Sequence, residues 1–231
     1  SANTFNVLEN DTVVSGSTTS AVGISTTGSN MTLTGASVNR DKGFSIVTNT
    51  GGSSYPEWIS HGLGVVPDLV MTKQRNNSAN WIVNIGANVI DSNDYTLNLN
   101  TTAGATLQGR QMTSTVVPLT YTPATQSFIS YAFKSVAGFS KIGSYVGTGV
   151  AGNKQTLTFE PSWIMIKDIN RTIGWTIFDT KRGANKYLEA NDANIEGDIA
   201  QSIVFESDGF SFQGGNYNNT GEDWLYMAFA N

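Results

Sequence analysis

The chain has 231 residues and a net charge of −5 at pH 7, and charged residues make up only 13% of it, against about 25% in an ordinary soluble domain. Its 39% hydrophobic residues are enough for a core, which excludes a wholly disordered chain. We expect no nucleic-acid partner, because binding one needs a basic face, and no membrane insertion, because no run of about 18 apolar residues occurs.

The first 41 residues are mostly Ser, Thr, Asn and Gly, and we expect them to form an extended N-terminal arm. Apolar residues between positions 5 and 14, and the segment 31–34, predict two short strands in this arm. Such a strand adds either to the sheet of its own module or to the edge of a neighbouring subunit, as in β-augmentation.

From residue 42 onward, short β-type runs alternate with turn signals rich in Gly and Asn, and this pattern predicts an all-β chain. The tripeptide Ser207-Asp208-Gly209 predicts a tight hairpin. Residues 183–198 form the one segment in which a short helix is expected. The predicted strands are 44–50, 69–73, 81–85, 115–119, 128–133, 156–159, 163–167, 175–178, 203–206, 210–213 and 224–229.

The chain contains an internal repeat. Four residues return at a constant offset of 94 positions: Pro67, Met71, Lys73 and Trp81 recur as Pro161, Met165, Lys167 and Trp175. We therefore predict two tandem β-sandwich modules of jelly-roll type, residues 42–136 and 137–231, related by internal duplication and preceded by the arm, residues 1–41. One sandwich shared by both copies is the alternative geometry, and chance similarity of β-rich segments is the alternative to duplication.

The repeated motifs resemble a known family. They are Gly43-Phe44-Ser45, His61-Gly62-Leu63-Gly64, residues 67–73 and Trp81 in the first copy, and residues 161–167, Trp175, 178–183, 207–210 and 226–229 in the second. Together they resemble a duplicated β-rich domain found in tailed-bacteriophage virion proteins, many of them tail-fibre or cyanophage structural proteins. The first copy departs from the family at 84–88, where Asp-Thr-Lys-Arg-Gly would stand. The resemblance implies a virion or extracellular fibre rather than a reaction.

The residue types leave little room for catalysis. The chain has no Cys and a single His, so a thiolate metal site is excluded and any Ser-His-Asp triad must use His61. His61 stands in a Gly-rich turn signal and no Gly-x-Ser-x-Gly elbow occurs, so we expect a turn histidine and no catalytic residue. We expect no cofactor and no metal, with a calcium site built from separate loops and a pair of glycosidase carboxylates as the alternatives.

Three aromatic residues are the candidate binding residues. Tyr55, Trp58 and Tyr217 stand in or beside Gly- and Asn-rich segments, where an aromatic ring and neighbouring amides suit a glycan or other receptor. The alternative is that these rings fold back onto their own module.

Two further pairs of residues have both a structural and a functional interpretation. Lys73 and Lys167 are expected to lie with their stems along Trp81 and Trp175, or else to contact a ligand. Asp179 and Arg182 are expected to form a local ion pair that closes a turn, or else an intersubunit contact.

We therefore expect a non-enzymatic structural subunit of a phage virion or extracellular fibre. Its expected partners are further copies of itself, as a homo-oligomer or filament, and other virion proteins, with or without a cell-surface glycan as receptor. A monomeric carbohydrate-binding module is the alternative function. An enzyme such as a depolymerase would need an acidic pair in a cleft.

Overall fold

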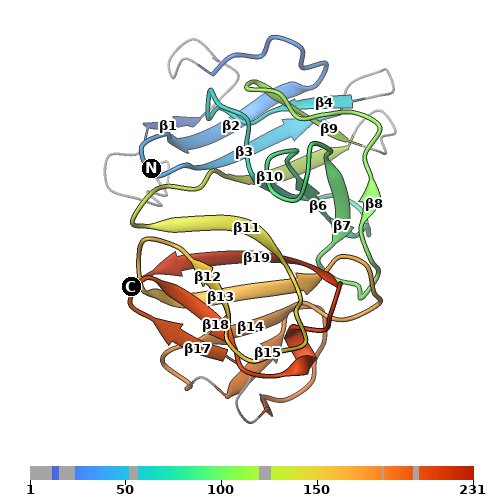
Figure 1. Cartoon of the computed structure of the whole chain (residues 1–231). Helices are drawn as coiled ribbons and strands as arrows, with labels where there is room; N and C mark the ends of the chain where they lie inside the picture. The colour runs from blue at the N-terminus through green and yellow to red at the C-terminus, as the bar shows by residue number, and fades with distance from the viewer. Residues whose placement is uncertain (1–11, 16–23, 52–56, 120–125, 184, 200–202) are drawn as a thin grey trace. The chain divides into compact units, whose positions relative to one another are not determined.

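The computed structural model describes residues 12–15, 24–51, 57–119, 126–183, 185–199 and 203–231 (Figure 1). Within them the chain is all-β, as the sequence predicted, apart from a short 3₁₀ turn, η2 (Gly215–Tyr217). The chain divides into two compact units. Unit 1 comprises Ser1–Thr96 and Leu107–Lys134, and unit 2 comprises Leu97–Thr106 and Ser135–Asn231.

The larger sheet of unit 1 has the strand order β1-β2-β3-β10-β5-β6-β7-β8, and its last two strands cross the division between the units. In that order the strands are Thr12–Ser15, Thr32–Asn39, Phe44–Thr50, Ser127–Phe133, Leu69–Gln74, Trp81–Ile85, Tyr95–Asn98 and Thr106–Leu107. A second, two-stranded sheet pairs β4 (Glu57–Ser60) with β9 (Val116–Leu119) in antiparallel register.

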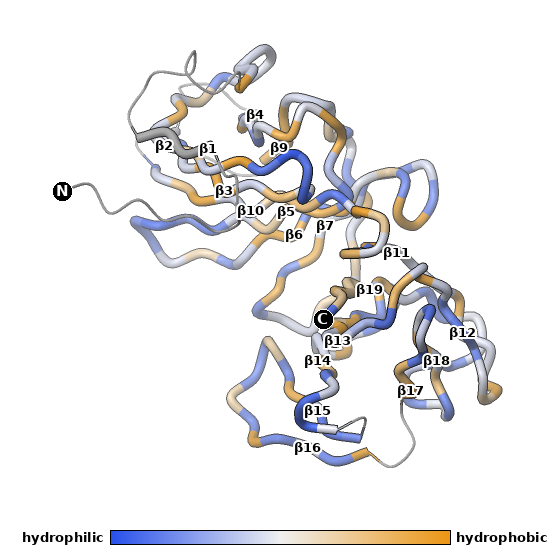
Figure 2. Tube along the Cα trace, turned by 90° about the vertical axis from the view of Figure 1, so that its left-hand side faces the viewer, coloured by the Kyte–Doolittle hydropathy of each residue, from blue (hydrophilic) through white to orange (hydrophobic). Residues whose placement is uncertain are grey.

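The core of unit 1 lies between these two sheets. Side chains of β3 and β10 alternate strictly between buried and half-buried, as expected for strands with one face on a core. Val47 and Phe128 of the larger sheet and Ile59 and Val117 of the smaller one belong to the same buried cluster. Figure 2 shows a hydrophobic stretch along β3. Two facing sheets around one core give the unit its β-sandwich character.

The predicted N-terminal arm contributes two strands to unit 1. β2 pairs with β3 over almost its whole length, with one irregularity between Leu33 and Gly35, and β1 pairs with β2. Leu33 and Val38 of β2 are buried in the core cluster. Of the two alternatives for this segment, the described residues therefore take the intramolecular one and extend the sheet of their own unit.

Unit 2 also contains a larger and a smaller sheet. The six-stranded sheet has the order β11-β19-β13-β14-β15-β16, which are Ser140–Val146, Asp223–Ala230, Pro161–Asp168, Thr176–Asp179, Lys186–Glu189 and Gly197–Asp198. The three-stranded sheet has the order β12-β18-β17, which are Asn153–Thr156, Gly209–Phe212 and Ile203–Glu206. Aromatic side chains dominate the core between them, among them Phe178, Phe210 and Trp224.

Two sequence predictions of local structure are wrong. The segment 183–198, where a short helix was expected, contains β15 and β16, which pair through Lys186 and Asp198 and are joined by an ion pair of 2.8 Å between the same residues. The strand expected at 156–159 ends at Thr156, because the chain turns there: Leu157 donates to the Asp208 carbonyl, and Thr158 has a φ of 70°.

The two units have the same internal strand order. In unit 1, β3-β10-β5-β6-β7 follow one another, and in unit 2, β11-β19-β13-β14-β15 do. The register also corresponds, since Met71 pairs with Val83 and Met165 pairs with Ile177, each 94 positions further on. This correspondence agrees with the predicted repeat, and duplication as its origin remains an inference.

Candidate functional site

His61 is buried at the end of β4, and backbone groups occupy both of its ring nitrogens. Nε2 lies 3.1 Å from the Thr113 carbonyl, and the Leu63 N–H donates to Nδ1 at 3.3 Å. These partners assign the proton of a neutral ring to Nε2. Burial lowers the pKa of His61 to about 4, against a smaller opposite effect of the Thr113 hydrogen bond. The ring therefore holds a turn together.

Asp179 and Arg182 form the predicted local ion pair at the end of β14. Asp179 Oδ1 accepts from the backbone N–H groups of Lys181 and Arg182, and Arg182 Nε lies 2.6 Å from Oδ2. Burial alone would raise the pKa of Asp179, but the hydrogen bonds and charge of Arg182 lower it. The pair closes a turn within its own unit.

A second turn of the same design follows β13. Asp168 Oδ1 accepts from the backbone N–H groups of Asn170 and Arg171, and Arg171 Nε lies 2.8 Å from Asp168 Oδ2. Arg171 Nε also lies 3.1 Å from Glu222 Oε2. This turn was not predicted from the sequence, although 168–171 and 179–182 share the spacing Asp-x-x-Arg.

The repeated lysines fold back onto backbone carbonyls. Lys73 Nζ donates to the carbonyl of Gln74 at 3.0 Å, and Lys167 Nζ donates to the carbonyl of Asp168 at 2.5 Å and to that of Arg171 at 3.2 Å. Lys167 is fully buried, and this burial lowers its pKa to about 8. The ammonium groups thus donate hydrogen bonds to carbonyls at or just after the ends of β5 and β13. These bonds favour the structural interpretation of both lysines.

Tyr217 does not offer a surface for a sugar, which contradicts the prediction of a binding role there. Its side chain is 7% exposed, and its ring packs edge-on against Phe178, with 5.2 Å between centroids, and against Trp224. Burial raises its pKa to about 12. The ring folds back because neighbouring Asn218 is fully buried and binds the Thr148 N–H and the Val150 carbonyl, which holds the loop against the unit.

The other two aromatic candidates belong to unit 1. Trp58 lies in β4 with a half-buried side chain, and its backbone N–H donates to Asn30 Oδ1 at 2.8 Å. Tyr55 lies outside the described residues. Of the two candidates within the described residues, Trp58 is thus the one whose side chain is not fully buried.

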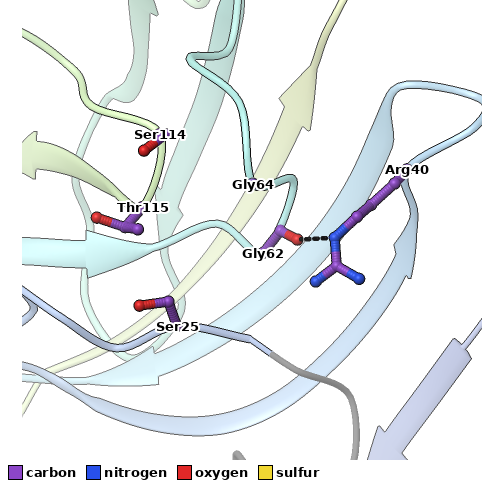
Figure 3. A pocket seen from close by; sticks show the side chains of 6 residues that line it. All are labelled: Ser25, Arg40, Gly62, Gly64, Ser114 and Thr115. Atoms are coloured by element: carbon purple, nitrogen blue, oxygen red, sulfur yellow. Dashed lines mark hydrogen bonds between the residues drawn. The ribbon is translucent and has the colours of Figure 1, made fainter.

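A small pocket of about 40 Å³ lies beside the His61 turn (Figure 3). Arg40 reaches across to donate from Nε to the Gly62 carbonyl at 3.0 Å. The hydroxyls of Ser25, Ser114 and Thr115 also line it. It is small because Ile24 and Val38 pack directly against Gly62.

A larger open depression of about 290 Å³ lies in unit 2, beside the turn that ends β12. It is lined by side chains from that turn and from the start of β11, among them Lys141, Thr156 and Thr158. This depression was not predicted from the sequence, because a left-handed Thr leaves no mark there.

The outer edges of the unit 2 sheets differ. The outer edge of β11 is covered by its own unit, since Ser135 Oγ accepts from the Ile142 N–H at 2.9 Å and Asn153 Nδ2 donates to the Val146 carbonyl at 3.0 Å. β17 is an edge strand as well, because it pairs with β18 alone among the described strands. Its Val204 is 41% exposed.

Comparison with known proteins gives a family. A family described as "Domain of unknown function (DUF7483)" matches residues 3–231. No curated protein and no solved structure matches the chain. Among the described residues, no group of three or more His, Asp and Glu is placed to hold a metal ion, and no helix has the length and apolar character needed to span a bilayer.

Proposed function

We propose that this chain, which belongs to the DUF7483 family, is a non-enzymatic structural subunit that associates with copies of itself through the outer edge of β17. The virion or extracellular-fibre setting is part of the proposal and rests on the resemblance of the repeated motifs. The observation that carries the proposal is the open edge of β17 with its exposed Val204.

An open edge strand is a template for pairing. Its unpaired N–H and C=O groups bind those of another strand, and proteins that avoid this place charges or short strands at the edge. β17 is short, with four residues, but it has only one charged residue, Glu206, and Lys154 Nζ lies 2.7 Å from its carboxylate. Two copies of β17 placed antiparallel would form one continuous sheet by a self-complementary contact.

The arrangement of polar groups supports a structural role. The His61 ring nitrogens and the Asp179 carboxylate bind groups of their own turns, and Lys167 is buried against carbonyls. These were the sequence candidates for catalysis or charged contacts. Each group instead stabilises the end of a strand.

Sedimentation velocity over a range of concentrations tests the proposal. We expect the average mass of the unmodified chain to rise with concentration, and V204K to sediment as a monomer at concentrations where the unmodified chain does not, because a lysine at an edge blocks pairing. The matched control is V65K, since Val65 is 48% exposed outside any strand. A monomer at every concentration, or equal effects of V204K and V65K, would contradict the proposal.

A further inference from the structure

The depression in unit 2 carries three polar groups that bind nothing in the described part of the chain. Lys141, Thr156 and Thr158 line it, and all three residues are exposed. Lys141 forms no ion pair with any described acidic residue, and neither threonine hydroxyl forms a hydrogen bond there. These groups are therefore available to a ligand.

The walls around these groups are fixed by hydrogen bonds. Ser135 Oγ accepts from the Ile142 N–H at 2.9 Å, and Ser140 Oγ accepts from the Val136 N–H at 3.2 Å. The buried Leu157, which also lines the depression, is held by a backbone hydrogen bond of 2.8 Å to Asp208. A depression with fixed walls loses little conformational entropy when a ligand enters.

The backbone of Thr158 is strained, whereas that of Gly62 in unit 1 is not. Its φ of 70° is the only positive φ of a non-glycine residue in the described chain, and a β-branched residue is sterically strained in this region. Gly62 stands two residues after β4, as Thr158 stands two residues after β12, and has a φ of 78°. A strained side chain at a place suited to glycine points to a use for that side chain.

The comparison also explains why this depression is open. In unit 1 a Cβ on Gly62 would lie 2.8 Å from Val38 Cγ2, because β2 covers the turn. In the described part of unit 2, no strand lies beyond β11, which corresponds to β3. No described strand of unit 2 therefore covers the turn after β12 as β2 covers the turn after β4, and Thr158 lines the depression there.

The chemistry of the open groups defines the ligand. An ammonium is a compact positive charge that favours a carboxylate, while threonine hydroxyls both donate and accept and so match the hydroxyls of a sugar. Leu157 supplies an apolar contact for a sugar ring. We infer that this depression binds a carboxylated sugar such as a hexuronate, with Lys141 on the carboxylate and Thr156 and Thr158 on ring hydroxyls.

Titration of the whole chain with glucuronate, followed by backbone amide NMR, tests the inference. We expect saturable shifts at residues 140–141 and 156–158. We expect glucose, which lacks the carboxylate, and inorganic phosphate, which lacks the ring, each to bind at least tenfold more weakly. If glucose bound as tightly as glucuronate, the carboxylate would not be recognised by Lys141. If phosphate bound as tightly, the site would not recognise a sugar ring. Either result, or the absence of shifts, overturns the inference.

Substitutions test whether the ligand binds in this depression. We expect K141Q to weaken glucuronate binding at least tenfold and T158G severalfold, and the matched control K181Q to leave it unchanged, since Lys181 is an exposed lysine elsewhere in unit 2. Unchanged binding in K141Q would overturn the inference. V204K should bind glucuronate normally, so that failure of this site and failure of self-association are distinguished.

Discussion

At the scale of single residues, the His61 ring couples folding to pH. Its pKa is about 4 in the folded chain and 6.5 in the unfolded one, so the unfolded state takes up a proton first as the pH falls. The contribution of neutral His61 to the free energy of unfolding is fully present above pH 6.5 and is lost as the pH falls from 6.5 to 4. A shift of this size corresponds to about 3 kcal/mol.

We therefore predict that the free energy of unfolding in urea falls by about 3 kcal/mol between pH 7 and pH 4 through His61 alone. Carboxylates titrate in the same range, so H61Q is the control. The difference between the two pH profiles isolates the histidine. Parallel profiles would show that His61 is not buried in its neutral form.

Thr158 gives a second prediction for a single residue. T158G removes a strained β-branched residue from a φ of 70°, and the gain exceeds the added entropy of a glycine in the unfolded chain. We expect the free energy of unfolding to rise by about 1 kcal/mol in denaturant melts. G62A, by contrast, should lower it by about 2 kcal/mol, because its Cβ would collide with Val38. Destabilisation by T158G would mean that the backbone there is not strained.

Residue roles were only partly predictable. His61 as a turn residue and the Asp179–Arg182 pair followed from local signals, namely flanking glycines and spacing within one turn. The burial of Tyr217 did not, because it depends on Asn218, whose partners Thr148 and Val150 are distant in sequence. Long-range hydrogen bonds of this kind leave no local pattern.

At the scale of elements, strands bordered by turn residues on both sides were predicted well. β3, β6 and β17 have the predicted bounds, because their runs of Val, Ile and aromatic residues are bordered by turn residues. The strand predicted at 156–159 lies instead at Asn153–Thr156, as β12. The residues of β12 are polar and give no strand signal in the sequence, and its pairing with β18 makes it a strand.

The two Asp-x-x-Arg turns allow a prediction about strand ends. The Asp168 side chain is 0% exposed and that of Asp179 is 18% exposed, while both accept the same set of hydrogen bonds. Removing the fully buried Asp168 carboxylate takes away the partner of Arg171 and of two backbone N–H groups at once, so we expect D168A to lower the free energy of unfolding by about 3 kcal/mol. D179A should lower it by about 1 kcal/mol. Equal losses in thermal or urea melts would contradict this ranking.

At the scale of the whole molecule, the two units share a strand order but differ at one edge of their larger sheets. In unit 1 the N-terminal strands β1 and β2 extend the sheet beyond β3, whereas in unit 2 the corresponding β11 is closed by side chains. The sequence predicted the repeat but not this difference, since edge closure depends on where the linker after β10 runs. The outer edge of β17, by contrast, has no partner strand among the described residues of unit 2.

Amide hydrogen exchange measured at low and high protein concentration tests this account most directly. Alternate amides of Ile203–Glu206 point away from β18 and lack a described partner within the chain. We predict that their protection increases at concentrations where the mass rises. Association without any added protection at β17 would show that the copies meet elsewhere, and would contradict the account.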